Sequence, residues 1–406
     1  MQKIATLSRA ALIFPLALVL YEFSVYVAND MIQPGMVQVT QEYAAGPEWV
    51  SRSMTAFLLG GTLITWLLGP LSDRIGRRPV MLAGVFLFTV SCLAILPVRD
   101  IYSYMALRVV QGMGLCFIGA VGYAAVQEAF EGKAAVKVMA LMANVALIAP
   151  LAGPVLGAAL MTVWPWRFTF VLIAAIAAIA LVGLWRSMPE TVQRSEKGAL
   201  SLGGILRDYW TLTRHSHFMM ASFSIVLLGT PLIVWIGLSP ILLMEKAGMT
   251  PLQYGLWQFP VVGSLIAGNI VLVKMTDRWP LGRSVTFGMS VMVVGALSLL
   301  PAFWWPQYGH YFLMAGVALM TFAEGLAFAV LYRFALTASA QASGAVAAAV
   351  GMMLMGGYAV LLEASSRILE AFGIGGLCLM IMVAVAVYFQ LAPRVVAKSM
   401  AARAEA

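Results

Sequence analysis

Residues 11–34, ALIFPLALVLYEFSVYVANDMIQP, form a run long and apolar enough to cross a bilayer as a helix, yet they include two acids. At 100° per residue the polar side chains of this run lie on one narrow stripe. They are Glu22, Tyr26, Asn29, Asp30 and Gln33. The two acids stand about 12 Å apart along the axis, so we do not expect them to share one proton. A carboxylate at membrane depth marks a candidate functional site, and the alternative is an acid satisfied by a neighbouring donor.

The composition is that of a membrane protein. The 406 residues are 62% hydrophobic and 10% charged, with a mean hydropathy of +0.92, whereas ordinary globular chains carry about a quarter charged residues. The net charge of +8 does not indicate nucleic acid, because the basic residues lie in short connections and are typical of topology signals. Cys92, Cys116 and Cys378 lie far apart inside apolar runs, which predicts buried thiols and no metal site. No cleavable signal peptide is expected, since the first run lacks a small-residue cleavage site.

Apolar runs predict twelve membrane-spanning helices. They are 11–34, 50–69, 79–97, 102–127, 136–160, 167–187, 217–243, 252–275, 284–304, 311–336, 344–366 and 372–391. When the connections are assigned alternately to two sides, most basic residues gather on one side. The other side has only Arg52, Arg99, Arg167, Lys246 and Arg367. This asymmetry predicts that both termini lie in the cytoplasm.

One long polar connection, residues 188–216, separates the spans six and six. Asp73-Arg74 follows the second span and Asp277-Arg278 follows the eighth, a weak echo of an internal duplication. We therefore expect an N-terminal six-helix bundle over 1–187, a cytoplasmic linker over 188–216 and a C-terminal bundle over 217–406. Two pseudo-symmetric bundles around a central cavity, with the binding site near the midplane, are a common transporter architecture.

Residues 69–79, GPLSDRIGRRP, are the most specific local signal in the chain. A Gly-Pro helix end, an acid, an arginine cluster and a second glycine predict a tight cytoplasmic turn. In that turn Asp73 would cap the next helix or pair with a basic partner across the bundle. The simpler alternative is a basic loop that only sets topology. We interpret the segment as a conformational latch made by Gly69, Asp73, Arg74, Gly76, Arg77 and Arg78.

This segment resembles the signature loop of the major facilitator superfamily. Three further segments narrow the resemblance. Residues 108–112, RVVQG, resemble the fourth-helix motif of proton-coupled members, and residues 149–157, APLAGPVLG, resemble the fifth-helix motif of drug–proton antiporters. The opening stretch, together with Asn144, resembles the MdfA-type multidrug antiporters, which include chloramphenicol exporters. The similarity covers essentially the whole chain and implies an all-α integral membrane fold of twelve helices in two six-helix bundles.

The fourth and fifth spans also carry physical signals of their own. Arg108 stays charged at any relevant pH, so inside a span it must find acceptors, either an acid or backbone carbonyls. In the fifth span Pro150 and Pro154 each remove a backbone hydrogen bond, while Gly153 and Gly157 remove bulk. This pattern predicts a bent helix with a smooth face against a neighbour. It is equally expected of a hinge, a seal against proton leak, or a plain kinked packing helix.

The resemblance implies that Glu22 and Asp30 form the acidic pair of a drug and proton site, with Arg108 as their partner. The residues it implies as lining the cavity are Tyr26, Asn29, Asn144, Ile233, Trp235 and Ile236. Glu324 departs from the type member of that subfamily, which has no acid there, although some chloramphenicol-exporting relatives carry one. We expect Glu324 to contribute to proton coupling, and the alternative is an acid paired with an arginine.

These features predict proton-coupled efflux of lipophilic drugs, cationic or neutral and chloramphenicol-like compounds among them, by alternating access. We expect a monomer in the bacterial inner membrane, driven by the proton gradient, with no cofactor, no metal and no nucleic acid. One alternative is a proton-coupled metabolite or sugar transporter, which the Pro-Gly fifth span and the scarcity of polar donors disfavour. Another is a non-transporting receptor, which would not need deep acids and usually brings a soluble output domain. An enzyme is disfavoured because no His/Asp/Cys cluster stands out.

Overall fold

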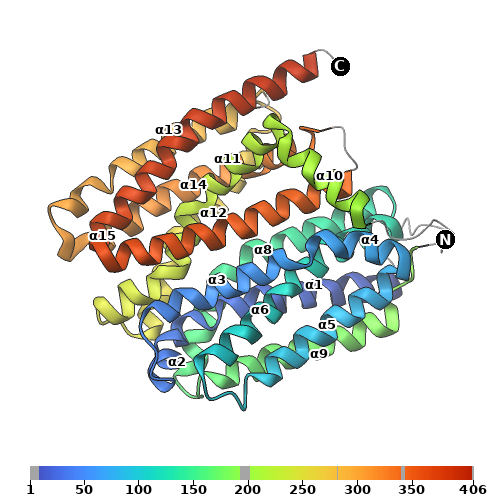
Figure 1. Cartoon of the computed structure of the whole chain (residues 1–406), viewed down its shortest axis with the longest axis horizontal. Coiled ribbons are helices and arrows are strands. Elements are labelled where there is room, and N and C mark those ends of the chain that lie inside the picture. The colour runs from blue at the N-terminus through green and yellow to red at the C-terminus, as the bar shows by residue number, and fades with distance from the viewer. Residues whose placement is uncertain (1–8, 193–201, 281, 340–342, 405–406) are drawn as a thin grey trace. The chain divides into compact units, whose positions relative to one another are not determined.

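The chain forms a bundle of long helices in the computed structural model shown in Figure 1. The structure describes residues 9–192, 202–280, 282–339 and 343–404, and these ranges contain helices, turns and no strand. Contacts divide the chain into two compact units. Unit 1 comprises Met1–Trp49 and Ala56–Ile205, and unit 2 comprises Val50–Thr55 and Leu206–Ala406.

Unit 1 is built from nine α-helices joined by short turns. They are α1 (Arg9–Asp30), α2 (Met36–Glu42), α3 (Glu48–Leu63), α4 (Thr65–Ile75), α5 (Arg77–Ala94), α6 (Ile101–Phe117), α7 (Tyr123–Ala129), α8 (Gly132–Met161) and α9 (Arg167–Ser187). A 3₁₀ turn, Gln33–Gly35, joins α1 to α2, and a π-helical segment, Ile118–Gly122, joins α6 to α7. Helix α1 packs against α8 and α9, and α5 packs against α6 and α9. The helix with the polar stripe is therefore surrounded by other helices of its own unit.

Two of the predicted spans are bent in unit 1. The span predicted over 50–69 consists of α3 and α4, which meet at an angle of 43°. Helix α8 bends by 44° between Lys137–Ala146 and Ile148–Met161. Pro150 has no N–H to donate to the carbonyl of Ala146 four residues earlier, so the bend lies one turn before the proline. The bent helix predicted from Pro150 and Pro154 is thus observed.

Local capping explains where several helices begin. The Asp100 carboxylate accepts a hydrogen bond from the Ser103 backbone N–H at 2.8 Å and starts α6. That hydrogen bond lowers the pKa of Asp100, because it stabilises the ionised form. In unit 2 a reciprocal capping box between Thr250 and Gln253 starts α12, with the two distances at 2.9 and 3.3 Å.

Unit 2 contains the remaining long helices. They are α10 (Leu202–Arg214), α11 (Ser216–Ser239), α12 (Pro251–Met275), α13 (Arg283–Leu297), α14 (Gly309–Leu336) and α15 (Ser343–Ala404). A π-helical segment, Pro240–Lys246, extends α11. Helix α14 packs against α11, α12 and α13, and α11 packs most extensively against α15. Helix α10 lies inside the stretch 188–216, which the sequence predicts only as a polar connection.

Helix α15 contains two spans rather than one. It covers 62 residues, but Gly373 has φ 65° and ψ −162°, which are not helical values. A positive φ of this kind costs glycine little and other residues more, so Gly373 allows the chain to reverse. The ribbon turns back at this point in Figure 1. Its two arms correspond to the spans predicted over 344–366 and 372–391.

Length and apolarity are consistent with the predicted membrane topology. In the described ranges nine helices are long and apolar enough to cross a membrane, or eleven when each bent pair is counted as one span. The last of them, Gly344–Ala401, is 58 residues long, more than twice the roughly 20 residues that one crossing needs. The prediction of an all-α integral membrane fold is therefore confirmed.

Candidate functional site

The polar stripe predicted over 11–34 is buried, although α1 ends at Asp30 and Gln33 lies in the 3₁₀ turn that follows. Glu22, Asn29, Asp30 and Gln33 each expose no more than 7% of their surface, and Tyr26 is half-buried. Asn29 donates from Nδ2 to Asp30 Oδ1 at 3.0 Å, and Gln33 Nε2 donates to the backbone carbonyl of Asn29 at 3.1 Å. Neighbouring members of the stripe therefore hold one another in place inside unit 1.

Arg108 of α6 lies beside the Asp30 end of the stripe. Its side chain is fully buried and donates from Nη1 to the carbonyl of Ala28 at 3.0 Å and to Gln111 Oε1 at 2.8 Å. From Nη2 it donates to Asn29 Oδ1 at 3.2 Å. Asn29 thus bridges the guanidinium and the Asp30 carboxyl group, since its amide accepts from one and donates to the other. The structure brings together Asp30, Asn29 and Arg108, three of the predicted site residues.

One aromatic group missed by the sequence reasoning lies beside Arg108. The ring of Phe57 lies 4.8 Å from the guanidinium carbon, within range of a cation–π interaction. Close packing of α3 on α6 makes this approach possible, because a Cβ atom at Gly112 would stand 1.8 Å from the carbonyl oxygen of Phe57. An aromatic residue in an apolar span has no sequence signal that would distinguish it from ordinary core.

Glu22 lies at the other end of the stripe in a different setting. Tyr123 donates its hydroxyl to Glu22 Oε1 at 3.3 Å, whereas Glu22 Oε2 has no partner among the described residues. Tyr123 begins α7 directly after the π-helical segment, and π-helical turns often occur at functional sites. Glu22 and Asp30 are therefore two separate positions, one held by a phenol and the other linked to a guanidinium.

The glycines of the fifth-span motif face the acid-bearing helix. A Cβ atom at Gly153 would lie 2.7 Å from the Cβ atom of Asp30, and one at Gly157 would lie 1.9 Å from the carbonyl oxygen of Met31. Only a glycine lets α8 approach α1 this closely, since the obstacle at Gly157 is backbone. The neighbour of the smooth face predicted for α8 is thus the segment that carries Asp30.

The remaining residues predicted to line the site have different surroundings. The side chain of Asn144 on α8 is exposed. On α11 of unit 2, Ile233 and Ile236 expose 9% and 8% of their surface, and Trp235 is fully buried. Its indole nitrogen donates to Gln258 Oε1 at 2.8 Å, so this ring packs toward α12 within unit 2.

Glu324 of α14 is the buried acid of unit 2. It exposes 6% of its surface, and its Oε2 atom has no partner among the described residues. A Cβ atom at Gly229 on α11 would stand 1.9 Å from the Tyr358 hydroxyl and 3.1 Å from Glu324 Oε1, so the missing side chain makes room for both groups. The ion pairs recorded in the described ranges do not include Glu324. The alternative of an arginine partner for Glu324 gains no support from these contacts.

The predicted latch is organised by Arg77. This side chain forms an ion pair with Asp73 four residues earlier and a second one with Glu128 of α7, at 2.9 Å. It also donates to the Ser72 hydroxyl and, at 3.5 Å, to the carbonyl of Gly69. Arg77 therefore ties the end of α4 to α7, as a latch requires.

The cap of α5 differs from the expectation for Asp73. Gly76 precedes α5 with φ 118°, and Asp73 makes no capping bond to that helix. Glu190, which follows α9, caps it instead. Its Oε1 accepts from the Arg77 backbone N–H at 2.9 Å and its Oε2 accepts from that of Arg78 at 3.3 Å. Of the two roles expected for Asp73, capping α5 is wrong, because its carboxylate pairs with the side chain of Arg77, the first residue of that helix.

The segment after α9 reaches the latch at two further points. Thr191 donates to Glu128 Oε2 at 2.5 Å, and Arg78 donates to the carbonyl of Trp185 at 2.5 Å. Arg74, another residue predicted for the latch, is exposed. Glu128, Glu190 and Thr191 lie 51 to 114 residues from Arg77, and no local pattern in the sequence connects them to the motif.

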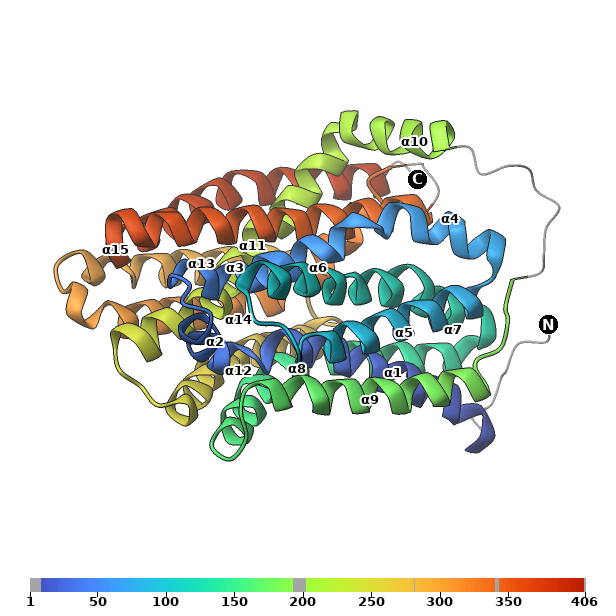
Figure 2. The same cartoon turned by 60° about the horizontal axis from the view of Figure 1, so that its bottom comes forward.

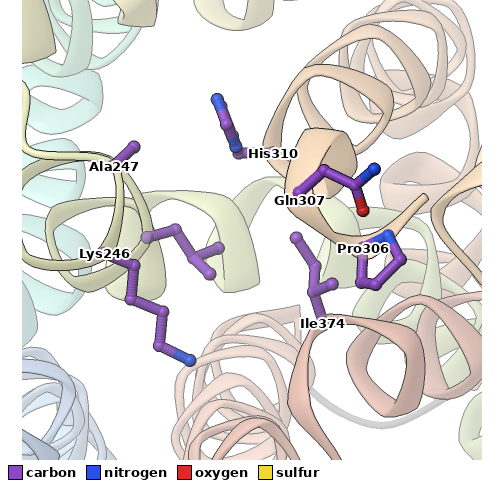
Figure 3. A pocket seen from close by; sticks show the side chains of 7 residues that line it. Lys246, Ala247, Pro306, Gln307, His310 and Ile374 are labelled. Carbon is purple, nitrogen blue, oxygen red and sulfur yellow. The ribbon is translucent and has the colours of Figure 1, made fainter.

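Two cavities are lined by residues other than Glu22, Asp30 and Glu324. One of about 490 Å³ in unit 1 is lined by Glu42, Tyr43, Leu96, Pro97, Val98, Arg99 and Arg167. The other, of about 280 Å³ in unit 2, is lined by Leu242, Lys246, Ala247, Pro306, Gln307, His310 and Ile374 (Figure 3). None of the seven residues around the second cavity is acidic. In the described ranges no group of three or more His, Cys, Asp or Glu side chains is arranged to hold a metal ion.

The two buried acids of unit 1 differ in the groups that could compensate their charge. A buried carboxyl group is costly when ionised unless a cation or hydrogen-bond donors compensate it. Asp30 accepts a hydrogen bond from Asn29, which in turn accepts one from the Arg108 cation. Glu22 accepts a hydrogen bond only from the Tyr123 phenol among the described contacts. The protonation state of each acid therefore depends on what occupies its surroundings.

Comparison with known proteins identifies the family. The model of the Major Facilitator Superfamily matches residues 18–362. The chain is 49% identical over 364 residues to the multidrug transporter MdfA of Escherichia coli O6:H1, covering 89% of this chain and 88% of that relative. It is 48% identical over 350 residues to MdfA of Yersinia pestis bv. Antiqua, covering 86% and 85%. It is also 46% identical over 357 residues to the chloramphenicol resistance protein CraA of Acinetobacter baumannii, covering 88% and 86%.

Solved structures support the same fold at much lower identity. A bacterial homologue of the human lysosomal transporter Spinster, in an inward-facing and unoccupied conformation, superposes with a TM-score of 0.69 at 14% identity. The alignment covers 97% of this chain and 99% of that structure. The human organic anion transporter MFSD10 gives a TM-score of 0.66 at 16% identity, covering 95% and 100%. The chain is a transporter rather than an enzyme, and it belongs to the Major Facilitator Superfamily.

Proposed function

We propose that this protein expels lipophilic drugs, cationic and neutral, in exchange for protons. The observation that carries the proposal is the chain of hydrogen bonds from Asp30 through Asn29 to Arg108, buried inside membrane-spanning helices. Relatives at 46% to 49% identity are named as a multidrug transporter and a chloramphenicol resistance protein, and chloramphenicol-like compounds are therefore proposed substrates.

The proposed coupling follows from charge balance at Asp30. A protonated Asp30 leaves Arg108 as the buried charge, held by carbonyl and amide oxygens. A cationic drug arriving near Asp30 stabilises the carboxylate, so the proton leaves. A returning proton removes that attraction and favours drug release. Neutral drugs would bind through shape and through hydrogen bonds to the protonated acid.

Glu22 and Glu324 are proposed as further coupling residues. Each has one carboxylate oxygen without a partner among the described residues, and each lies beside a tyrosine. Glu22 and Glu324 expose 0% and 6% of their surface to solvent in this structure. Proton exchange with water at either acid therefore needs movement of the surrounding helices. Tyr26, Asn29, Asn144, Ile233, Trp235 and Ile236 are proposed to contact the drug in one or other state of the cycle.

The proposed cycle alternates between an inward-open and an outward-open state. We propose the N-terminal and C-terminal halves, 1–187 and 217–406, as the moving parts and the network around Arg77 as the latch between states. The Gly-Pro face of α8 would seal against proton leak, because it leaves no gap beside Asp30. The protein is proposed to act as a monomer in the inner membrane, without a cofactor and with both termini in the cytoplasm, consistent with the basic-residue asymmetry.

The direct test measures protons released when a drug binds. Purified protein in weakly buffered detergent solution would receive ethidium, a lipophilic cation, while a pH-sensitive dye reports proton release. We expect release from the unchanged protein and none from Asp30→Asn, which cannot ionise. Glu370→Gln, at an exposed acid of unit 2, is the matched control and should release protons normally.

The same variants would then be tested for transport in proteoliposomes with an imposed pH gradient. We expect Asp30→Asn to lose gradient-driven ethidium export while remaining monodisperse in size-exclusion chromatography. If Asp30→Asn retained both drug-dependent proton release and gradient-driven export, Asp30 would not be the coupling residue.

A further inference from the structure

Helix α10 lies inside the polar connection 188–216 and differs in kind from the spans, because it is amphipathic. It has 13 residues, too few to cross a bilayer, and it includes Arg207, Asp208 and Arg214. At 100° per residue its apolar side chains occupy about 160° of the circumference. They are Leu202, Ile205, Leu206, Tyr209, Trp210 and Leu212. The apolar face of such a helix is unfavourable in water, so it is expected to pack against protein or lipid.

The fold covers only one edge of that arc. Leu212 is 1% exposed, and Ile205 and Tyr209 are half-buried, so this edge lies against protein. Leu206 and Trp210 lie on the other edge, one turn apart, and are 58% and 60% exposed. Among the apolar side chains of α10 that the structure describes, Leu206 and Trp210 are therefore the uncovered ones, and we call them the Leu206–Trp210 strip.

Two arginines border this strip on the side away from the protein. Arg207 and Arg214 stand 60° and 40° from Trp210 around the helix, counted at 100° per residue, and both are exposed. The guanidinium carbon of Arg214 lies 4.8 Å from the centre of the Trp210 ring. An exposed tryptophan flanked by arginines matches the interface of a bilayer, where indole rings sit at headgroup level and cations meet lipid phosphates.

The position of α10 in the chain places the strip at that level. Helix α11, a membrane-spanning helix, begins at Ser216, with only His215 between it and the end of α10, and Figure 2 shows α10 leading into it. Trp210 is six residues from Ser216, which is about 9 Å at the rise of an α-helix. The headgroup region on each side of the hydrocarbon is of similar depth, about 5 to 8 Å. The short tether thus keeps the strip within reach of the lipid headgroups.

We infer that α10 is an interfacial anchor whose Leu206–Trp210 strip inserts between lipid headgroups while Arg207 and Arg214 bind anionic lipid phosphates. The anchor holds the start of α11 at a defined depth. The basic-residue asymmetry assigns it to the cytoplasmic leaflet. This inference depends on membrane insertion of the chain and not on drug export or on the role of Asp30.

The test measures how deep each face of α10 lies in a bilayer. The three native cysteines, all buried, would first be replaced, and a spin label would be attached at position 206, 210 or 211. Position 211 is on the polar face and is the matched control. Collision of each label with oxygen, which concentrates in lipid, and with a water-soluble nickel chelate would be measured by electron paramagnetic resonance in nanodiscs of phosphatidylglycerol and phosphatidylcholine.

We expect the labels at 206 and 210 to favour oxygen over the nickel chelate, and the label at 211 to favour the chelate. Labels at 206 and 210 that meet the chelate as freely as the label at 211 would overturn the anchor. Labels shielded from both reagents would overturn it too, because protein rather than lipid would then cover the strip.

The role of the arginines needs a second comparison. Replacing phosphatidylglycerol with phosphatidylcholine alone should lower the ratio of oxygen to chelate collisions at position 210 by about twofold or more. The variant Arg207→Gln/Arg214→Gln should show no such dependence on lipid charge. If the unchanged arginines gave no dependence either, binding to anionic lipid would be disproved, while the depth measurement would still report on the strip itself.

Discussion

The buried acids of the two units are held in opposite ways. In unit 1, Asp30 is linked through Asn29 to the guanidinium of Arg108, which has its own carbonyl and amide acceptors. In unit 2, Glu324 lies beside a tyrosine hydroxyl in the space left by Gly229, and the ion pairs of the described ranges do not include it. A hydrogen-bond donor and a guanidinium are therefore available to stabilise an ionised Asp30. The described residues provide no ion pair that would stabilise an ionised Glu324.

A second difference separates the turns that precede α5 and α13. Gly76 and Gly282 each precede one of these helices with a positive φ, 118° and 90°. A Cβ atom at Gly76 would meet the Glu190 carboxylate at 2.3 Å, and one at Gly282 would meet the Val396 side chain at 2.7 Å. A glycine with positive φ thus meets a polar cap in unit 1 and an aliphatic side chain in unit 2, although the two ψ angles differ, 148° and −17°. Charged groups therefore surround the turn before α5 but not the glycine before α13.

Replacing Arg108 should have the largest effect of any change in unit 1. Arg108→Ala removes the donor to Ala28, Gln111 and Asn29, and each buried acceptor left without a partner costs about 1 to 3 kcal/mol. We expect export to be abolished and the thermal midpoint in detergent to fall. Arg333→Ala, at an exposed arginine in the last turn of α14, is the control and should change neither. Near-normal export by Arg108→Ala would contradict the view that Arg108 stabilises the charge of Asp30.

The contact between α8 and α1 should give the next largest effect. Gly157→Ala places a Cβ atom 1.9 Å from the Met31 carbonyl oxygen, and overpacking of this kind costs about 1 to 3 kcal/mol. Gly263→Ala in α12 of unit 2 meets nothing within 4 Å and should stabilise the helix by up to about 1 kcal/mol. The two glycine replacements are therefore expected to shift the thermal midpoint in opposite directions, and only Gly157→Ala should reduce export. If both replacements shifted the thermal midpoint in the same direction, the role of Gly157 would not be to let α8 approach the backbone of Met31 closely.

The acid of unit 2 is expected to have a smaller effect than Asp30. Glu324→Gln keeps a polar side chain of the same shape but cannot ionise, and a loss of about 1.4 kcal/mol of coupling corresponds to about a tenfold fall in rate. We expect chloramphenicol export in proteoliposomes to drop by about that factor, with drug-induced proton release reduced but still measurable. A complete loss of proton release, equal to that expected for Asp30→Asn, would make the two acids equivalent and contradict the comparison.

The smallest effect is expected at the cap of α5. Glu190→Ala removes the acceptor for two backbone N–H groups, and loss of a helix cap costs about 1 kcal/mol. We expect a small fall in the thermal midpoint and about a twofold slower export, because the latch rather than the acid site is affected. Glu131→Ala is the matched control, since Glu131 precedes α8 without a side-chain capping bond. Equal effects of the two changes would mean that Glu190 has no special role at the latch.

Much of the fold could be predicted from the sequence, because every helix that crosses a bilayer needs a minimum length of apolar residues. About 20 apolar residues are needed, so the positions of the spans follow from hydropathy, as the close match of α9, α12 and α14 to 167–187, 252–275 and 311–336 shows. The polar stripe of α1 was also predictable, since helical periodicity alone places Glu22 and Asp30 on one face. The bend of α8 followed from the missing N–H of Pro150.

Tertiary structure alone decided which groups face these residues. Glu128 reaches Arg77 from α7 and Glu190 reaches it from the segment after α9, while Tyr123 reaches Glu22 across 101 residues. Gly157 meets the backbone of Met31. No pattern within a helix specifies such partners, because they depend on how helices rotate and approach one another. Residue order therefore determined where charge lies in the membrane, and packing determined what compensates that charge.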